Sequence, residues 1–260
     1  MTRQTKLRPA AYLAVVAVLL ARLPVSVLGE DGDKRESHVV QVVADLVRAS
    51  GSAGGICSLV GGDDVELALA LAKQGPFVVH CLLADHQACQ RVRQQIRSKG
   101  LYGPVSAEVL EGDRLPYAAN LVNIVVLTPS PSAEPPIPIA EVQRVLAPLG
   151  TLLVRDSVAE GLESDRIERW TRELRSAGLS GISRIATGSP WFKANKPWPT
   201  DIDEWTHYLH GSDGNPVAQD RVVGPPRHYQ WLSGPMFQRS HETDSSVSTL
   251  VTSRGRLFSI

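Results

Sequence analysis

The feature that most constrains the fold of this chain is an alternation of short apolar runs with segments of helical periodicity. The first apolar run, 56–60, ends in Gly61-Gly62 and is followed by an Ala/Leu-rich segment over 65–73. Short runs of this kind are typical of strands that a parallel sheet buries on both faces. Since parallel strands are joined by crossovers that are usually helices, the alternation predicts an α/β domain.

The alternation continues from Ser37 to Ile185. Ser37 and Asp85 are each expected to cap a helix, because segments of helical character follow them. We predict strands over 56–60, 77–83, 105–110, 121–127 and 151–154, and helices over 38–47, 65–73, 86–99, 139–146 and around 167–174. The proline-rich stretch 129–138 is expected to be a loop, and Pro148-Leu149-Gly150 a turn. The predicted fold is a Rossmann-like, doubly wound, mainly parallel sheet with 56–60 at its centre and helices on both faces.

The first 29 residues are predicted to be a signal peptide and not part of the fold. Arg3, Lys6 and Arg8 precede an uncharged apolar run over 10–21, and Val27-Leu28-Gly29 offers a cleavage point before Glu30. An uncleaved anchor is the alternative, but a membrane-spanning helix needs about 20 apolar residues and this run is shorter. We therefore expect an exported protein, periplasmic or extracellular, without a stable membrane span after cleavage.

Charge and cysteine content narrow the range of partners. Lys plus Arg and Asp plus Glu each number 27, so the formal net charge is +0 and no global field favours nucleic acid or an anionic membrane surface. A small molecule or a protein is the expected partner. The cysteines, Cys57, Cys81 and Cys89, lie in apolar segments, which predicts buried thiols and not a disulfide framework or a thiol-redox site.

The sequence changes in character after residue 188. Tryptophans are spread among prolines and glycines over 189–246, so we expect an irregular connecting segment there. Residues 247–260 have strand character, interrupted by Ser253-Arg254-Gly255, and this strand has no evident partner in the chain. We expect the stretch after Ser189 to pack poorly alone and the chain to be the N-terminal part of a longer protein. The expected organisation is a signal peptide over 1–29, an α/β domain over 30–188, the connecting segment over 189–246 and a terminal strand over 247–260.

Three stretches of the predicted α/β domain form a recognisable series. They are the turn Gly61-Gly62, then Gly112-Asp113-Arg114-Leu115-Pro116-Tyr117 before the fourth strand, then Glu141-Val142-Gln143-Arg144-Val145-Leu146-Ala147-Pro148-Leu149-Gly150-Thr151-Leu152-Leu153-Val154. With them, the region from Ser37 to Ile185 resembles class I S-adenosylmethionine-dependent methyltransferases. The resemblance marks the fold more than the chemistry.

The resemblance implies where S-adenosylmethionine would bind. The corresponding positions lie in the first turn, after the second strand and before the fourth: Gly61, Gly62, Asp63, Asp85 and Asp113. Asp113 matches the acidic residue that often contacts adenine, and Asp85 stands near the position of the acidic residue that holds the ribose hydroxyls.

The same comparison implies that the cofactor site is degenerate. Of three alternating glycines usual in the first turn, the chain keeps Gly61 and has Asp63 and Val65 at the other two positions. The usual acidic residue at the end of the second strand corresponds to Leu83, and Asn123 stands at a common aspartate position. We therefore expect weak or absent S-adenosylmethionine binding, and the resemblance identifies no catalytic residue.

A second resemblance lies in the connecting segment. Lys196-Pro197-Trp198-Pro199, the stretch 201–210, Gly224-Pro225-Pro226-Arg227 and Gln230-Trp231 resemble the segment of bacterial proteins that leads from such a domain into a pyrroloquinoline-quinone-dehydrogenase-like β-propeller. The resemblance implies that 247–260 is the opening propeller strand. Pyrroloquinoline quinone would bind only in a longer chain, because a blade needs about four strands and a ring several blades.

The connecting segment also contains a possible metal-binding pattern. Glu204, His207 and His210 fall three residues apart, so on a helix they could present ligands toward one side. Flanked by Trp205 and Tyr208, such residues more often belong to a helix that docks on a neighbour, with its histidines hydrogen-bonded. We therefore assign no metal site.

Two functions from different classes fit the sequence. One is an exported methyltransferase-like enzyme that moves a methyl group from S-adenosylmethionine to an unknown acceptor by holding donor and acceptor in line. The other is a non-catalytic scaffold or binding domain that supports a quinoprotein-like propeller or another partner. Export and the loss of cofactor contacts both favour the second function. Binding of S-adenosylmethionine would separate the two.

Overall fold

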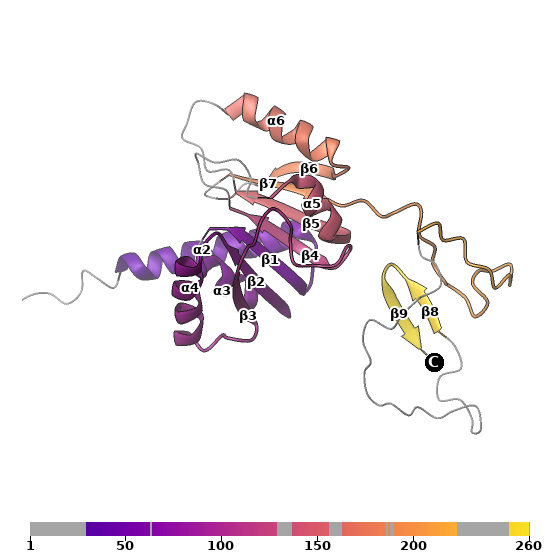
Figure 1. The fold of residues 1–260 in the computed structure, drawn as a ribbon, viewed down its shortest axis with the longest axis horizontal. Coiled ribbons are helices and arrows are strands. Elements are labelled where there is room, and N and C mark those ends of the chain that lie inside the picture. Colours follow the sequence, from indigo (N-terminus) through magenta and orange to yellow (C-terminus); the bar gives the residue numbers. More distant parts are fainter. Residues whose placement is uncertain are drawn as a thin grey trace, which may run out of the picture.

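The structure is a computed structural model that describes residues 30–62, 64–128, 137–155, 163–185, 187, 190–222 and 250–259. The predicted signal peptide over 1–29 and most of the predicted loop over 129–138 lie outside these residues. An α/β domain is followed by an irregular segment and a small hairpin (Figure 1). None of the helices in the described ranges is long and apolar enough to cross a membrane.

The α/β domain is built on a seven-stranded sheet with the order β3-β2-β1-β4-β5-β7-β6 (Figure 1). The pairs among the first five strands are parallel, and β7 is antiparallel to both of its neighbours. The strands are β1 (Gly55–Gly61), β2 (Phe77–Leu83), β3 (Val105–Val109), β4 (Val122–Leu127), β5 (Leu146–Arg155), β6 (Ser180–Ile185) and β7 (Trp191–Asn195). The predicted mainly parallel sheet, with 56–60 near its centre, is confirmed.

Helices cover both faces of the sheet because its strands are apolar on both sides. Cys57 and Leu59 of β1 pack in one core with three helices, α2 (Glu30–Ser50), α3 (Val65–Lys73) and α4 (His86–Ser98). Val60 packs in a second core with α5 (Ile139–Val145) and α6 (Glu163–Ser176). This in-and-out alternation along each strand is what a doubly wound fold requires.

Two details of the predicted elements need correction. The helix before β1 already includes Glu30, so Ser37 lies inside it and not at its start. The stretch Pro148-Leu149-Gly150 lies within β5, where Leu149 has φ of 64° and the pairing with β4 shifts register. Gly150 is required there, because a Cβ atom would lie 2.7 Å from the carbonyl oxygen of Ala147. The expected turn is therefore an irregularity inside a long strand.

The α/β domain extends beyond the predicted boundary at residue 188. Strand β7 follows that boundary, yet it lies between β5 and β6 in the sheet. Trp191 and Phe192 are each 1% exposed and belong to opposite cores. Lys196, just after β7, donates through Nζ to Asn120 Oδ1 at 2.6 Å and to the Gln143 carbonyl oxygen at 2.7 Å. The irregular segment therefore begins after Lys196.

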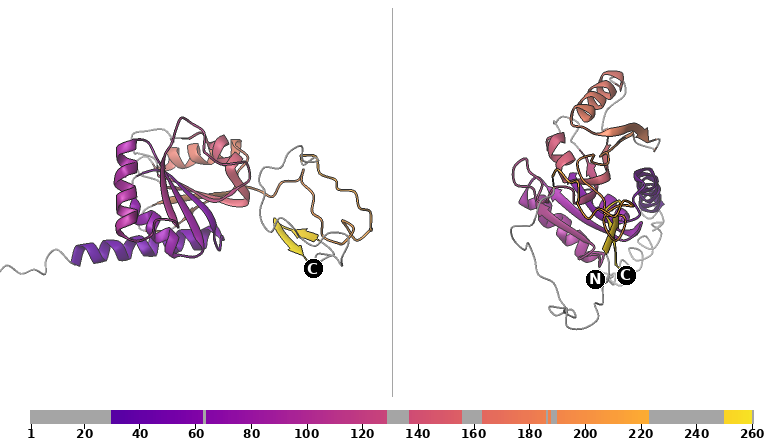
Figure 2. Two further views of the ribbon diagram at one scale, coloured as in Figure 1. Left: turned by 60° about the horizontal axis from the view of Figure 1, so that its bottom comes forward. Right: turned by 90° about the vertical axis from the view of Figure 1, so that its right-hand side faces the viewer.

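The described part of the terminal stretch is a hairpin and not a lone strand. Strand β8 (Leu250–Ser253) pairs with β9 (Arg256–Ser259) in antiparallel register. The hairpin is joined to the irregular segment, since Trp205 N–H donates to Thr252 Oγ1 at 2.8 Å and Thr252 N–H to the Trp205 carbonyl oxygen at 2.6 Å. Figure 2 shows this unit standing apart from the α/β domain.

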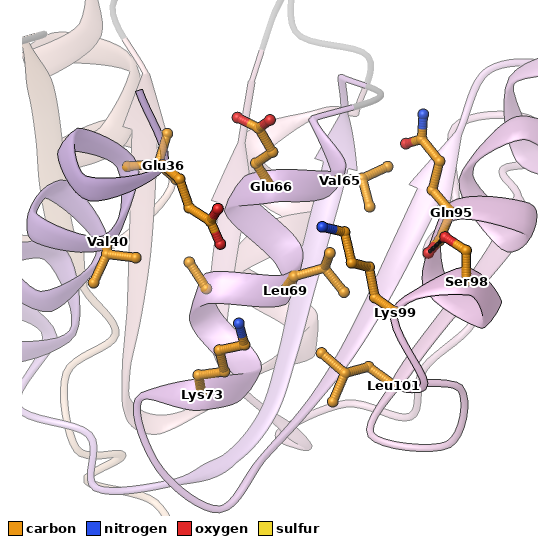
Figure 3. Close-up of a pocket in the computed structure, with 12 residues that line it drawn as sticks. Glu36, Val40, Val65, Glu66, Leu69, Lys73, Gln95, Ser98, Lys99 and Leu101 are labelled. Atoms are coloured by element: carbon orange, nitrogen blue, oxygen red, sulfur yellow. Dashed lines mark hydrogen bonds between the residues drawn. The ribbon is translucent and has the colours of Figure 1, made fainter. Parts of the chain in front are cut away.

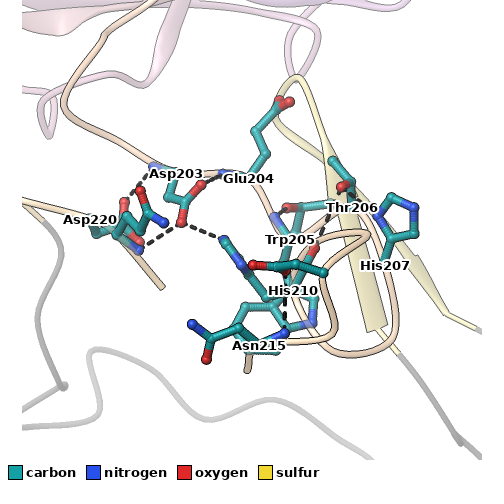
Figure 4. A network of polar contacts seen from close by, with 11 residues as sticks. Asp203, Glu204, Trp205, Thr206, His207, His210, Asn215 and Asp220 are labelled. Atoms are coloured by element: carbon teal, nitrogen blue, oxygen red, sulfur yellow. Dashed lines mark hydrogen bonds and ion pairs between the residues drawn. The ribbon is translucent and has the colours of Figure 1, made fainter. Parts of the chain in front are cut away.

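The stretch 201–210 is held by a polar network and is not helical (Figure 4). Asp203 Oδ2 accepts hydrogen bonds from His210 Nε2 at 2.6 Å and from the backbone of Gln219 at 2.7 Å. Both contacts favour the ionised carboxylate and hold the pKa of Asp203 below its usual range. The prediction of a helix here is thus wrong. His210 instead stabilises an irregular segment through its hydrogen bond to Asp203. Within the described ranges, no three His, Cys, Asp or Glu side chains lie close enough together to hold a metal ion.

The three cysteines are expected to be unreactive in the folded protein. Cys57, Cys81 and Cys89 are free and buried, as predicted from their apolar surroundings. Burial raises the pKa of Cys57 and raises that of Cys81 to about 12, which suppresses the thiolate that reacts. Ellman's reagent should therefore detect three thiols in denaturant and react much more slowly in buffer. Rapid reaction in buffer, or fewer than three thiols in denaturant, would contradict this expectation.

Candidate cofactor site

The parallel sheet brings the predicted cofactor residues to one edge. The last paired residues of β1, β2 and β3 are aligned in register, so the residues that follow these strands lie at the carboxyl edge of the sheet. Doubly wound folds bind their ligands at this edge. Of the predicted residues, Asp63 lies outside the described part of the chain, and the structure places the others here: Gly61, Gly62, Asp85 and Asp113.

Contacts within the protein account for both glycines of the first turn. Gly61 has φ of 110°, and a Cβ atom there would lie 2.9 Å from the Thr128 carbonyl oxygen. Gly62 N–H donates to Thr128 Oγ1 at 2.7 Å, and a Cβ atom on Gly62 would lie 2.8 Å from the same oxygen. Thr128 N–H in turn donates to the Val60 carbonyl oxygen at 3.0 Å. The turn is therefore fixed between β1 and the end of β4, and the glycine pair alone does not indicate a ligand.

Val65, which stands at the third position of the expected glycine series, does not crowd the first turn. Val65 is the first residue of α3, and its side chain is buried in the core that α3 shares with α2 and α4. The side chain therefore packs against the helix layer. Val65 is therefore explained by helix packing.

An ion pair that no local sequence pattern indicates lies beside the turn. Asp64 Oδ1 accepts from Leu67 N–H at 3.1 Å and so caps α3, while Oδ2 pairs with the Arg155 guanidinium at 2.9 Å. The Arg155 guanidinium also lies 5.0 Å from the ring centroid of Trp191. The Asp64 carboxylate is thus committed to the protein's own cation, at a partly exposed site where such a pair is worth little stability.

An apolar side chain stands at the position that the resemblance assigns to the ribose contact. Leu83, at the end of β2, is 1% exposed and packs in the core beneath α3 and α4. Asp85 is exposed and caps α4, with Oδ1 accepting from Ala88 N–H at 2.8 Å. Its second carboxylate oxygen has no hydrogen-bond partner among the described residues and is the one acceptor here that a hydroxyl could use.

The loop that carries Asp113 is held by side chains of α5. Residues 110–121 join β3 to β4 without a helix. Glu141 Oε1 accepts from Leu115 N–H at 2.8 Å, and Arg144 donates to the Tyr117 carbonyl oxygen at 2.9 Å. Glu141 and Arg144 also pair at 2.6 Å, which holds the pKa of Glu141 below its usual range. Asp113 is exposed in this anchored loop, free to meet a ligand at the sheet edge.

A chain of polar contacts fixes the same loop to the sheet. The Tyr117 hydroxyl lies 2.8 Å from His80 Nδ1 and 3.0 Å from Ser58 Oγ, while His80 Nε2 lies 3.3 Å from Glu108. Burial lowers the pKa of His80 against the opposing effect of Glu108, and burial raises the pKa of Tyr117 to about 12. Near neutral pH both groups are therefore uncharged, and the Tyr117 hydroxyl donates to Ser58 Oγ.

The lowered pKa of His80 predicts a loss of stability on acidification. A histidine whose pKa is lower in the folded state than its ordinary value of about 6.5 binds protons more readily when unfolded. The free energy of unfolding should therefore fall as the pH drops below that value, and His80→Gln should reduce this fall. Urea unfolding of both proteins across this pH range, above the titration of most carboxylates, is the measurement. Parallel pH profiles for the two proteins would refute the assignment.

Asn123 lies at the opposite edge from the predicted cofactor residues. It is the second residue of β4. Its side-chain Oδ1 accepts a hydrogen bond from Ile56 N–H at 2.9 Å, at the start of β1. Its side chain also lies against Gly55, which has φ of 108°. Asn123 therefore fixes the start of β1 and has no contact with the carboxyl edge.

Comparisons with known proteins identify the fold of the α/β domain. By sequence, no protein-family model and no curated protein matches the chain. By structure, the chain is similar to a candidate S-adenosyl-L-methionine-dependent methyltransferase from Methanococcus maripaludis, with a TM-score of 0.52 and 16% identity, over 66% of this chain and 94% of the other. A S-adenosylmethionine-dependent methyltransferase from Aquifex aeolicus aligns with a TM-score of 0.47 and 16% identity, over 62% and 96% of the two chains. The alignment with the first of these proteins shows that the α/β domain has the class I methyltransferase fold, as the sequence resemblance implied.

Proposed function

We propose that this chain is an exported protein built on a methyltransferase-like domain with a degenerate S-adenosylmethionine site, and that it acts as a binding or scaffold domain. The observation that carries the proposal is the buried Leu83 at the ribose position. A ribose hydroxyl buried without a partner costs about 1–3 kcal/mol, which is about fivefold to 150-fold in affinity. The alternative, an active methyltransferase with an unknown acceptor, would need other groups to replace this contact.

The contacts that remain support weak binding at the same edge. Asp85 retains one uncommitted carboxylate oxygen, and Asp113 is exposed in an anchored loop. The ion pair of Asp64 with Arg155 leaves no free carboxylate in the described part of the first turn for the cofactor's ammonium group. Two contacts of low strength correspond to an affinity in the millimolar range.

Amide chemical shifts measured during a titration with S-adenosylmethionine test the location of this weak site. We expect small shifts for Gly62, Asp85 and Asp113 that do not saturate below millimolar concentration. Asp85→Asn is the matched control, because asparagine caps a helix as well as aspartate and removes only the charge offered to the ribose. It should reduce the shifts and leave stability unchanged. Shifts that are as large in this variant, or that map away from the sheet edge, would count against the proposal.

The scaffold role draws support from the terminal hairpin. A two-stranded hairpin is marginally stable alone, and Leu257 and Phe258 are 67% and 48% exposed in the described structure. Such residues suit further β-structure or a partner protein, and a propeller of the quinoprotein type is the partner that the resemblance suggests. Export is the first step of this role, and sequencing the N-terminus of the protein recovered outside the cytoplasm should find Glu30 at or near the start.

A further inference from the structure

A cavity of about 400 Å³ lies in the helix layer on one face of the sheet (Figure 3). Helices α2, α3 and α4 enclose it on three sides, and its size falls within the range of small-molecule sites. Its walls are largely apolar, formed by Val39, Val40, Val65, Leu69, Ala70 and Leu101. An apolar body could therefore be bound here without loss of hydrogen bonds.

Two lysines are the cationic residues of the lining, whose other polar residues are Glu36, Glu66, Gln95 and Ser98. Lys73 ends α3 and Lys99 follows α4, and Figure 3 shows both side chains extending over the apolar walls. Neither ammonium group pairs with a carboxylate in the described ranges. Both lysine side chains are otherwise exposed, so they can adjust to a ligand.

Two carboxylates also line the cavity, and they offset the positive charge of the lysines to different degrees. Glu66 already has an interaction partner, and Figure 3 shows its carboxylate pointing away from Lys73 and Lys99. Glu36 is exposed on α2, and its carboxylate extends toward the cavity in Figure 3. The two ammonium groups therefore outnumber the one carboxylate that is left to meet a ligand.

We propose that this cavity binds an amphipathic anion, a molecule with an apolar chain or ring system and a single carboxylate or sulfonate. The apolar part would lie against Leu69 and its neighbours, and the anionic group would lie between Lys73 and Lys99. The proposal does not depend on the cofactor site, because none of Gly61, Gly62, Asp85 and Asp113 lines this cavity.

Calorimetric titration of the protein with decanoate, below its micelle concentration, tests the proposal. We expect saturable binding with one site, about tenfold weaker for octanoate because two methylenes fewer are buried. Lys73→Met with Lys99→Met should weaken binding at least tenfold, whereas Glu36→Gln should strengthen it. Arg172→Met is the matched control, since it removes an exposed cation on α6, outside the cavity, and should change nothing.

The preference of the cavity for an anionic or a cationic head group distinguishes this site from an apolar surface that binds hydrophobic chains nonspecifically. Decyltrimethylammonium has the same chain with a cationic head and should bind more weakly than decanoate. Equal or tighter binding of the cation, no binding of decanoate, or lysine variants that bind as well as the unmodified protein would each overturn the proposal. The substituted lysines are exposed, so a folding defect is not expected, and circular dichroism of each variant checks this.

Discussion

A chain that ends at residue 188 is expected to lose the cooperative unfolding of the α/β domain, whereas one that ends after Pro197 is expected to keep it. The difference between them is β7, which pairs with both β5 and β6. Trp191 and Phe192 are each 1% exposed, and removing a buried aromatic side chain costs about 3–5 kcal/mol. Two such losses equal much of the roughly 5–15 kcal/mol that stabilises a domain.

Urea unfolding of the two shortened chains beside the complete one measures this effect. The longer chain retains Lys196, whose Nζ contacts tie the end of β7 to Asn120 and to the carbonyl group of Gln143. We expect its transition midpoint to be close to that of the complete chain. A cooperative transition at the same midpoint in the chain ending at residue 188 would show that β7 contributes nothing to the domain.

Leu83→Asp is expected to destabilise the domain by about 4 kcal/mol or more at neutral pH and not to restore a cofactor site. Leu83 is 1% exposed within an apolar core, and burial of a carboxyl group can raise its pKa by about 3–5 units, each worth about 1.4 kcal/mol. Simple replacement by the family's acidic residue thus conflicts with the packing of β2 against α3 and α4.

Leu83→Asn separates the charge from the loss of apolar packing. A carboxyl group with a raised pKa is neutral in acid, so the excess cost of the aspartate over the asparagine variant should grow with rising pH and shrink as the pH falls. Thermal unfolding of the two variants at several pH values provides the comparison. Two variants of equal stability at neutral pH would mean that position 83 faces solvent or a polar site.

The sequence predicted the parallel half of the sheet because local pattern and tertiary role agree there. The apolar run 56–60 is a buried strand by composition alone, and Asp85 is a helix cap by position alone. Strand β7 escaped prediction because its place is set by pairing with β5, about forty residues earlier in the chain. The alternation of Trp191 and Phe192 between two cores was the available signal.

The sequence contains a signal for the terminal hairpin, but the prediction of a single interrupted strand was wrong. Arg254 and Gly255 interrupt the strand pattern, and both have positive φ, 45° and 74°. Two central residues of this kind form the tight turns that join antiparallel strands, so the interruption was the turn itself.

The candidate site was predictable only in part. Parallel topology places Gly62, Asp85 and Asp113 at one edge, which follows from the order of the elements. The pair of Asp64 with Arg155 and the contact of His80 with Tyr117 join residues far apart in sequence, and no local pattern indicates either.

Calorimetric titration of the protein with S-adenosylmethionine tests the central claim most directly. The account predicts a dissociation constant in the millimolar range, because the remaining contacts are few and Leu83 offers none to the ribose. Asp85→Asn should weaken even this binding. A saturable micromolar affinity in the unmodified protein would contradict the degenerate site and favour an active methyltransferase.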